Sequence, residues 1–366
     1  MLTMQKNLSK PFYMLLSLPA TAMGFALSVQ ISALSWILTT KYGLNIHEVG
    51  LVWAAGPIAG ILGQVIVGII SDNVWFWNGR RKPFILIGGV LASMMLLALP
   101  NIGIISASMG IDGLLGVAIA IALTLDLSIN VSFNPTRAII ADVTPQGEKR
   151  TQGYTWMQTI SGSFGVLAYA IGAWFGNMTL IYFSVGLVLF MSIIPPFFIK
   201  EPKSLINEAV TVKAPQEKFG FGKVMMIIQP LWGFILYDIY AMGLQLSGVK
   251  TDHYWAEIIA ALITLALLIK TLGASEQGLS KQQAGMVGFK KILAAHSFSW
   301  IGIQTMFVFI FAYLQDKMPG LEGDELGKII SISFLVLSAV SAVLPALVLE
   351  PLSAKIGRVK THAICI

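Results

Sequence analysis

The sequence has 366 residues, of which 56% are hydrophobic and only 11% are charged, and its formal net charge is +6. Soluble domains carry about 25% charged residues, so the composition excludes a soluble globule and indicates an integral membrane protein. A single cysteine excludes an intrachain disulfide, and the four histidines show no metal-ligand spacing. We therefore expect no metal and no cofactor. The net positive charge is typical of cytoplasmic loops rather than of nucleic-acid binding.

Ten apolar segments approach the roughly 20 residues that a helix needs to cross a bilayer. They lie near 12–39, 48–71, 83–101, 111–140, 153–175, 178–199, 224–246, 254–272, 291–314 and 327–350. With a cytoplasmic N-terminus, 19 of the 24 Lys and Arg residues fall on the cytoplasmic side, four fall outside and one lies within a span. This asymmetry follows the positive-inside rule, and one missed span would remove it. The first segment is interpreted as a retained helix rather than a signal peptide.

The turn "SDNVWFWNGRRKPF" concentrates charge between the second and third spans, with an acid at Asp72 and bases from Arg80 onward. A similar group, "GRVK", begins at Gly357 after the tenth span. Matching loops in two parts of a chain are typical of transporters built from related repeats. The alternative interpretation is that the turn only orients its two helices by the positive-inside rule.

The two loops lie further apart than the roughly 180 to 200 residues that six spans with short connections occupy. We therefore expect an N-terminal six-helix half at 1–200, a cytoplasmic linker at 201–223, an inserted transmembrane hairpin at 224–272 and the start of a C-terminal half at 273–366. Only two spans of that second half are complete, so the sequence is interpreted as C-terminally truncated. We expect this chain alone not to transport.

The fourth span, "LTLDLSINVSFNPTRAIIADV", places two charges within a membrane helix. Such charges cost about 2.5 to 3.5 kcal/mol each and usually face a cavity or a partner. At about 100° per residue, Asp126, Asn130, Asn134 and Arg137 share one face, and Asp126 and Arg137 are about 16 Å apart along the axis. The pattern predicts a cavity lined at two depths, with a kink at Pro135. A buried structural network between helices is the alternative.

Other polar residues within the spans are less specific. Gln30 and Gln64 are candidates either for lining the cavity or for hydrogen bonding between helices. Asp238, inside the hairpin, is a functional candidate because ionisable residues within spans are costly. Gly172-x-x-x-Gly176 predicts close helix packing. The sequence shows no Ser/His/Asp set and no nucleotide-binding loop, so an enzyme is disfavoured, and a transporter or a non-transporting sensor remains.

The segments "GPIAG", "GIISDN" and "NGRRKPF", together with the fourth span, resemble helices 1 to 4 of the sucrose–proton symporters. These belong to the major facilitator superfamily, near the glycoside–pentoside–hexuronide cation symporters. The acid and the Gly-Arg pair are spaced more widely here than in the general superfamily motif, as in the sucrose symporters. The resemblance implies an all-α membrane fold of two six-helix halves and proton-coupled transport of a disaccharide or glycoside, such as sucrose or maltose, by alternating access. Transport of another small solute is the alternative.

The resemblance also implies roles for individual residues. Asp126 is the candidate protonatable carboxylate, and Arg137 is a substrate or proton-coupling partner. The candidates for binding substrate or protons are Asp126, Asn130, Asn134, Arg137, Gln30 and Gln64. The candidates for a cytoplasmic gate that ties helices together are Asp72, Gly79, Arg80, Arg81, Asp142, Gly357 and Arg358. The expected partners are a sugar, protons and lipid, in a bacterial inner membrane with the N-terminus in the cytoplasm.

Overall fold

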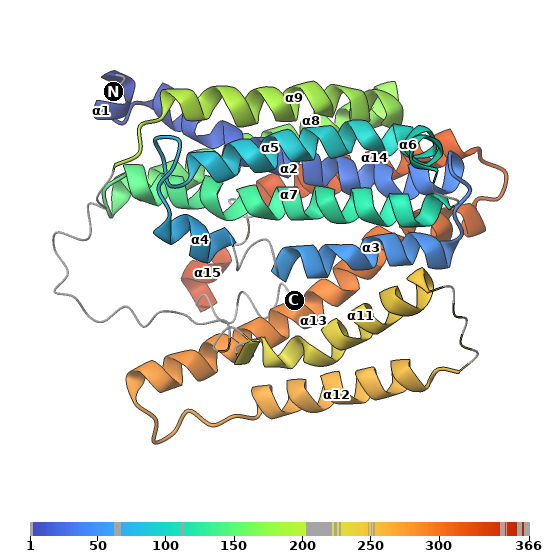
Figure 1. The fold of residues 1–366 in the computed structure, drawn as a ribbon. Coiled ribbons are helices and arrows are strands. Elements are labelled where there is room, and N and C mark those ends of the chain that lie inside the picture. Colours follow the sequence, from blue (N-terminus) through green and yellow to red (C-terminus); the bar gives the residue numbers. More distant parts are fainter. Residues whose placement is uncertain are drawn as a thin grey trace. The chain divides into compact units, whose positions relative to one another are not determined.

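The computed structural model describes residues 3–61, 67–110, 113–202, 222, 225–226, 228–247, 249, 251, 253–344, 348, 350–356 and 361. Within that part of the chain every element is a helix, apart from one β-bridge between Phe76 and Gly79 (Figure 1). The chain divides into two compact units, one formed by residues 1–212 and 309–366 and the other by residues 213–308. The helical architecture confirms the expected all-α fold class.

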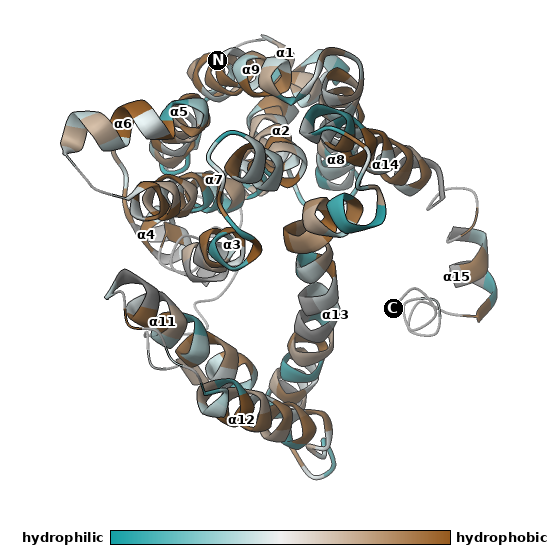
Figure 2. Ribbon diagram, turned by 90° about the vertical axis from the view of Figure 1, so that its right-hand side faces the viewer, coloured by the Kyte–Doolittle hydropathy of each residue, from teal (hydrophilic) through white to brown (hydrophobic). Residues whose placement is uncertain are grey.

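The first unit is a bundle in which α2, α5, α7, α8 and α9 contact one another along their lengths. Its elements are α1 (Thr3–Lys6), α2 (Lys10–Thr40), α3 (Ile46–Ile61), α4 (Val67–Asn73), α5 (Lys82–Ala98), η2 (Leu99–Asn101), α6 (Ile102–Met109), α7 (Leu114–Val143), α8 (Glu148–Phe175), α9 (Asn177–Phe198), α14 (Gly323–Leu344) and α15 (Glu350–Ile356). Figure 2 shows hydrophobic residues along most of these helices.

The second unit contains a helical hairpin in which α11 packs against α12. Its elements are η3 (Gln229–Leu231), α11 (Trp232–Leu246), α12 (Trp255–Leu272) and most of α13 (Lys281–Lys317), whose residues from 309 onward belong to the first unit. Gly233 permits the close approach of the two hairpin helices, because a Cβ there would lie 2.4 Å from Thr264 Oγ1.

Five of the described helical segments are long and apolar enough to cross a membrane: 10–40, 82–109, 114–143, 177–198 and 255–272. Each falls where the sequence predicts a span. The 28-residue α8 is not among them, because its first half is rich in polar side chains. That polarity needs its own explanation in a membrane protein.

The third span continues beyond the end that the sequence predicts. Pro100 interrupts the α-helix with the turn η2, and the chain then resumes as α6 to Met109. Polar side chains bind carbonyls at this break: Lys41 Nζ donates to Pro100 O at 2.7 Å, and the Tyr42 hydroxyl donates to Leu99 O at 2.9 Å. Because the broken helix end is satisfied in this way, the proline bends the span without terminating it.

At the opposite end of the bundle, the chain segments before α2 and after α9 are joined. The side chain of Gln5 donates to Lys200 O at 2.7 Å and accepts from Lys200 N–H at 3.0 Å. The Tyr13 hydroxyl donates to Lys149 O at 3.0 Å, which brings the start of α8 to the same place. These contacts fix the position of the residues that follow α9, and one of those residues completes the site described next.

Candidate functional site

The turn between α4 and α5 is a tight hairpin. Backbone hydrogen bonds of 3.1 Å run in both directions between Phe76 and Gly79. Its central residues, Trp77 and Asn78, have φ of 47° and 58°, as in the type I′ turns that close two-residue hairpins. This compact turn accommodates the wide spacing between Asp72 and the Gly-Arg pair, and it delivers the three consecutive bases to the start of α5.

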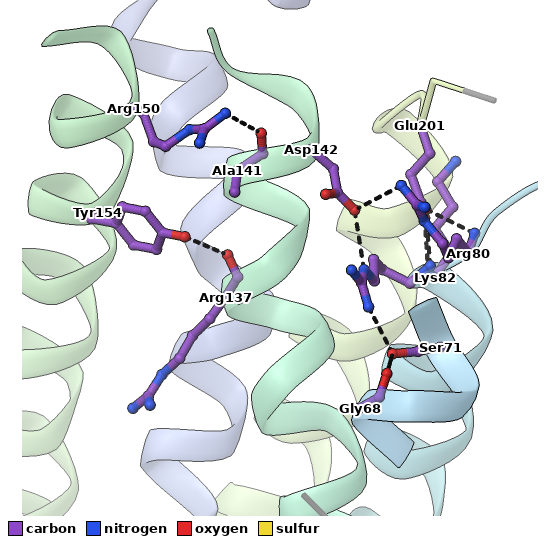
Figure 3. Close-up of polar contacts among 11 residues, drawn as sticks. Gly68, Ser71, Arg80, Lys82, Arg137, Ala141, Asp142, Arg150, Tyr154 and Glu201 are labelled. Carbon is purple, nitrogen blue, oxygen red and sulfur yellow. Dashed lines mark hydrogen bonds and ion pairs between the residues drawn. The ribbon is translucent and has the colours of Figure 1, made fainter. Parts of the chain in front are cut away.

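The side chains of this turn are held by a carboxylate from α7. Asp142 Oδ2 accepts a hydrogen bond from Arg81 Nε at 3.0 Å and lies 3.6 Å from Arg80 Nη2 (Figure 3). Arg81 Nη1 also donates to Ser71 Oγ at 2.7 Å, and Ser71 Oγ donates to Gly68 O at 3.1 Å. The side chains of Arg81 and Asp142 are only 8% and 9% exposed. Breaking such a shielded pair is costly, because the remaining charge stays buried.

The backbone of the same turn is held by Glu201, which follows α9. Its carboxylate accepts the backbone N–H groups of Arg80, Arg81 and Lys82 at 2.8, 2.9 and 2.8 Å. These donors surround the N-terminus of α5, where a helix has unsatisfied N–H groups and a positive dipole end. A Cβ on Gly79 would lie 2.7 Å from Glu201 Oε1, so a larger residue there would displace the carboxylate from its position. We name Ser71, Arg80, Arg81, Asp142 and Glu201 the charge cluster.

The charge cluster unites several of the predicted gate residues and adds one that sequence reasoning missed. Arg80, Arg81 and Asp142 meet as described, and Gly79 makes room for the missed residue, Glu201. The available signal for Glu201 was an acid directly after the sixth apolar span, on the same side of the membrane as the basic turn. The side chain of Asp72 and the residues Gly357 and Arg358 lie outside the described part of the chain.

The polar face of α7 packs against a row of glycines. A Cβ on Gly56 would lie 3.2 Å from Asp126 Oδ2, which is tighter than ordinary contact. Two further positions continue this row at ordinary distances, Gly60 at 4.0 Å from Asn130 Nδ2 and Gly68 at 3.7 Å from Asn134 Nδ2. The polar side chains therefore lie against bare backbone of α3 and α4, in space that larger residues would fill.

Asp126 is buried between three helices. It is 9% exposed, and the side chain of the buried Gln30 of α2 lies next to its carboxylate. Asn130 Nδ2 donates to the backbone carbonyl of Asp126 at 2.8 Å. Asp126 Oδ2 and Gln30 Oε1 have no hydrogen-bond partner within the described chain. Two buried acceptors without a donor are unusual in proteins, and a proton or a ligand hydroxyl would satisfy them. Gln64 lies outside the described residues.

Arg137 lies in a different environment from Asp126. Its side chain is exposed, its guanidinium stands 4.6 Å from the Phe133 ring centroid, and its backbone carbonyl accepts the Tyr154 hydroxyl of α8 at 3.2 Å. Figure 3 shows the side chain pointing away from the charge cluster. The structure therefore places Asp126 against α3 and leaves the Arg137 guanidinium available from outside the helix packing.

A second polar contact joins α14 to α2 and α9. Ser32 Oγ and Ser331 Oγ are 2.8 Å apart, and both donate to Asn177 Oδ1, at 3.3 and 3.2 Å. We name Ser32, Asn177 and Ser331 the Asn177 junction. A Cβ on Gly172 would lie 2.6 Å from Ser331 Oγ, which confirms the close packing predicted at this glycine, whereas a Cβ on Gly176 would meet nothing within 4 Å. Sequence reasoning missed Asn177, whose signal is a lone amide between two adjacent apolar spans.

Comparison with known proteins places this architecture in a family. The family model described as Major Facilitator Superfamily matches residues 16–365. The chain is 28% identical over 193 residues to the general alpha-glucoside permease of Schizosaccharomyces pombe, covering 47% of this chain and 34% of the permease. It is 30% identical over 193 residues to the sucrose transport protein SUC3 of Arabidopsis thaliana, covering 47% and 31%.

A longer match extends to the sucrose transport protein SUT2 of Oryza sativa subsp. indica, which is 26% identical over 293 residues, covering 66% of this chain and 58% of the relative. The matched part thus spans from 31% to 58% of the length of these three relatives. The crystal structure of the nucleoside transporter NupG superposes with a TM-score of 0.50 at 10% identity, covering 90% of this chain and 98% of that one, a likeness in fold alone. The chain is an integral membrane protein and belongs to the major facilitator superfamily.

Proposed function

We propose that the full-length protein is a proton-coupled sugar symporter that works by alternating access. Its substrate class is a disaccharide or glycoside, with sucrose and maltose as the first candidates. The names of the relatives, sucrose transport proteins and an alpha-glucoside permease, support a sugar. The observation that carries the proposal is the carboxylate of Asp126, which lies buried in the helix bundle with one oxygen unpartnered.

The surroundings of Asp126 suit a group that takes up and releases a proton. An ionised carboxylate in a membrane interior is costly unless it is paired. Protonation would remove that charge and create an O–H donor beside Gln30, whose Oε1 is also unpartnered. Asn130 and Asn134 on the same face supply amide donors and acceptors suited to sugar hydroxyls. In this proposal Arg137, exposed on the same helix, contacts the substrate.

We propose the charge cluster as part of the cytoplasmic gate, with Asp72, Gly357 and Arg358 as further members. Its shielded ion pair and the Glu201 cap link α4, α5, α7 and the segment after α9, so a change at one of these elements is transmitted to the others. The orientation follows the positive-inside count, with the N-terminus in the cytoplasm of a bacterial inner membrane.

The domain layout remains part of this proposal. It assigns 1–200 to the first six-helix half, 201–223 to a linker, 224–272 to an inserted hairpin and 273–366 to the second half. The hairpin helices pack on each other, as an insertion with its own helix pairing would. No cofactor is needed for this function.

The test is proton movement in proteoliposomes that contain the full-length protein, challenged in turn with sucrose, maltose and glucose. A symporter makes the external medium more alkaline when its sugar is added, because protons enter with the sugar. Asp126→Asn should abolish this signal, whereas Asp324→Asn, at the exposed start of α14, should retain it. Absence of a response to every sugar in the wild-type protein would remove the sugar assignment.

A further inference from the structure

One face of α8 carries polar residues where a membrane helix would normally present apolar ones. The exposed residues of this face recur at helical spacing: Thr155, Gln158, Thr159, Gly162 and Ser163. We name them the polar face of α8. These residues lower the hydropathy of α8, which is why α8 is not among the helices that are apolar enough to span a membrane. Its neighbours in the chain, α7 and α9, are both among them.

Contact between this face and the hydrocarbon core of the membrane would be unfavourable. The Thr155 and Ser163 hydroxyls donate to carbonyls of their own helix, at 3.0 and 2.9 Å, and such hydroxyls are tolerated in lipid. The Gln158 side chain differs, because its amide offers two donors and an acceptor that cannot all be satisfied within its own helix. Leaving these groups unpaired in an apolar medium is costly. The neighbouring α9 instead exposes Phe190 and Phe197, as a lipid-facing helix should.

The contacts of α8 with α14 lie further along the helix. Tyr169 stacks on Phe334 of α14 with ring centroids 5.5 Å apart, and Gly172 lies against Ser331. The polar face precedes these contacts by one to several turns. A Cβ on Gly162 would meet no atom within 4 Å, so open space lies directly over the centre of the face.

Arg137 of α7 contacts α8 directly before this face. The hydrogen bond from the Tyr154 hydroxyl to Arg137 O sets the register of the two helices, and Gln158 lies one turn, about 6 Å, beyond Tyr154. In Figure 3 the Arg137 side chain extends on the side of α7 that faces Tyr154 of α8, away from the charge cluster. A fixed guanidinium fork and an amide on adjoining helices together form a set of hydrogen-bond donors that matches neighbouring hydroxyl groups.

We propose that the polar face of α8 and Arg137 form a binding wall for one hydroxylated ring of the transported sugar, with Gln158 as a residue that determines specificity. This inference rests on the proposed function and adds a location for the substrate, separate from the carboxylate at Asp126. Gly162 leaves room for the ring, and Gln158 and Arg137 bind its hydroxyls. Thr155 and Ser163, whose hydroxyls bond to carbonyls of α8 itself, border the ring.

The first test is the reactivity of single cysteines with N-ethylmaleimide in membranes that contain the full-length protein. Cys365, the one cysteine of this sequence, is replaced by serine, and Gln158→Cys, Thr159→Cys and Gln152→Cys are made one at a time. The thiolate reacts and needs water to form, so reactivity reports an aqueous environment. We expect Gln158→Cys to react and to be protected by sucrose or maltose.

Two control positions give the result its meaning. Gln152, which donates to Glu148 at the first turn of α8, should yield a reactive thiol that neither sugar protects. Phe190→Cys on α9 should be unreactive because it faces lipid. Reaction at Gln158→Cys without protection by either sugar would overturn the proposal. An unreactive thiol there would equally overturn it, because it would mean that lipid or another helix covers this face.

The second test is sugar exchange, which needs no proton gradient. Gln158→Ala should raise KM about tenfold, the effect of leaving one hydrogen-bonding group of the complex unpaired, while Vmax changes little. Gln158→Asn, which keeps the amide, should recover part of the affinity. Unchanged KM in Gln158→Ala, in a protein whose wild type transports the sugar, contradicts this inference alone. Absence of transport by the wild type contradicts the proposed function instead.

Discussion

The Glu201 cap on α5 provides the sharpest stability prediction. The buried carboxylate accepts three backbone N–H groups at 2.8 to 2.9 Å. Hydrogen bonds to charged groups contribute about 1.5 to 3 kcal/mol each, but water can reach part of the turn once the side chain is removed. We therefore expect Glu201→Ala to lower the free energy of unfolding by about 3 to 5 kcal/mol, below the sum of three bonds. Glu201→Gln keeps one acceptor oxygen and should fall between the wild type and Glu201→Ala.

The assay is unfolding of the purified protein in detergent, followed by the fluorescence of its nine tryptophans. The matched control is Glu276→Ala, which breaks an ion pair of 3.1 Å with Lys291 in which the side chains are 30% and 48% exposed. Such surface pairs contribute about 0 to 1 kcal/mol. If Glu201→Ala destabilises the protein no more than Glu276→Ala does, the carboxylate does not hold the turn and the reasoning fails.

Three glycine substitutions test the close contacts. Gly79→Ala should displace Glu201, since the new Cβ would lie 2.7 Å from its Oε1, and should lower the unfolding temperature toward that of Glu201→Ala. Gly56→Ala should impair proton-coupled uptake more than stability, because its Cβ would lie 3.2 Å from Asp126 Oδ2, and the two are compared by flux and by thermal unfolding. Gly327→Ala should cost about 1 to 3 kcal/mol through overpacking, measured by unfolding, because its Cβ would lie 2.7 Å from the amide nitrogen of the Asn177 junction.

Gly116→Ala is the control for all three substitutions. It lies in α7 and its Cβ would meet nothing within 4 Å, so it changes helix propensity without a steric conflict. A loss in Gly116→Ala as large as in the other variants would show that the contacts are not the cause. Normal stability and uptake in Gly79→Ala and Gly56→Ala would contradict the geometry on which the charge cluster and the Asp126 site depend.

The helices of the N-terminal part were predictable because a membrane span can be recognised in a sequence by its length and its apolar composition. The fourth span also revealed its polar face, since Asp126, Asn130 and Asn134 recur at helical spacing and do pack together against glycines. Periodicity alone cannot tell which side of a helix meets a neighbour. The spacing therefore placed Arg137 on the same face as Asp126 but did not reveal that the Arg137 side chain is exposed and that Asp126 is buried.

Several other contacts between segments distant in sequence could not be predicted. Glu201 binds a turn that lies far earlier in the chain, and nothing in its local sequence, Lys-Glu-Pro after an apolar span, indicates that partner. Asn177 meets Ser331 only because Gly172 and Gly327 let the helices approach. The continuation of the third span past Pro100 depends similarly on Lys41 and a neighbouring tyrosine. In each case the local structure depends on side chains from distant parts of the chain.

The role of Asp126 in carrying the proton is tested most directly by comparing two modes of transport in Asp126→Asn proteoliposomes. Exchange of labelled for unlabelled sugar requires the binding wall and the gates but no net proton movement, whereas accumulation against a gradient requires the proton. We expect sucrose or maltose exchange to persist in Asp126→Asn, whereas accumulation driven by a proton gradient should be lost. Accumulation to the wild-type level in this variant would show that another group carries the proton and would contradict the role assigned to Asp126.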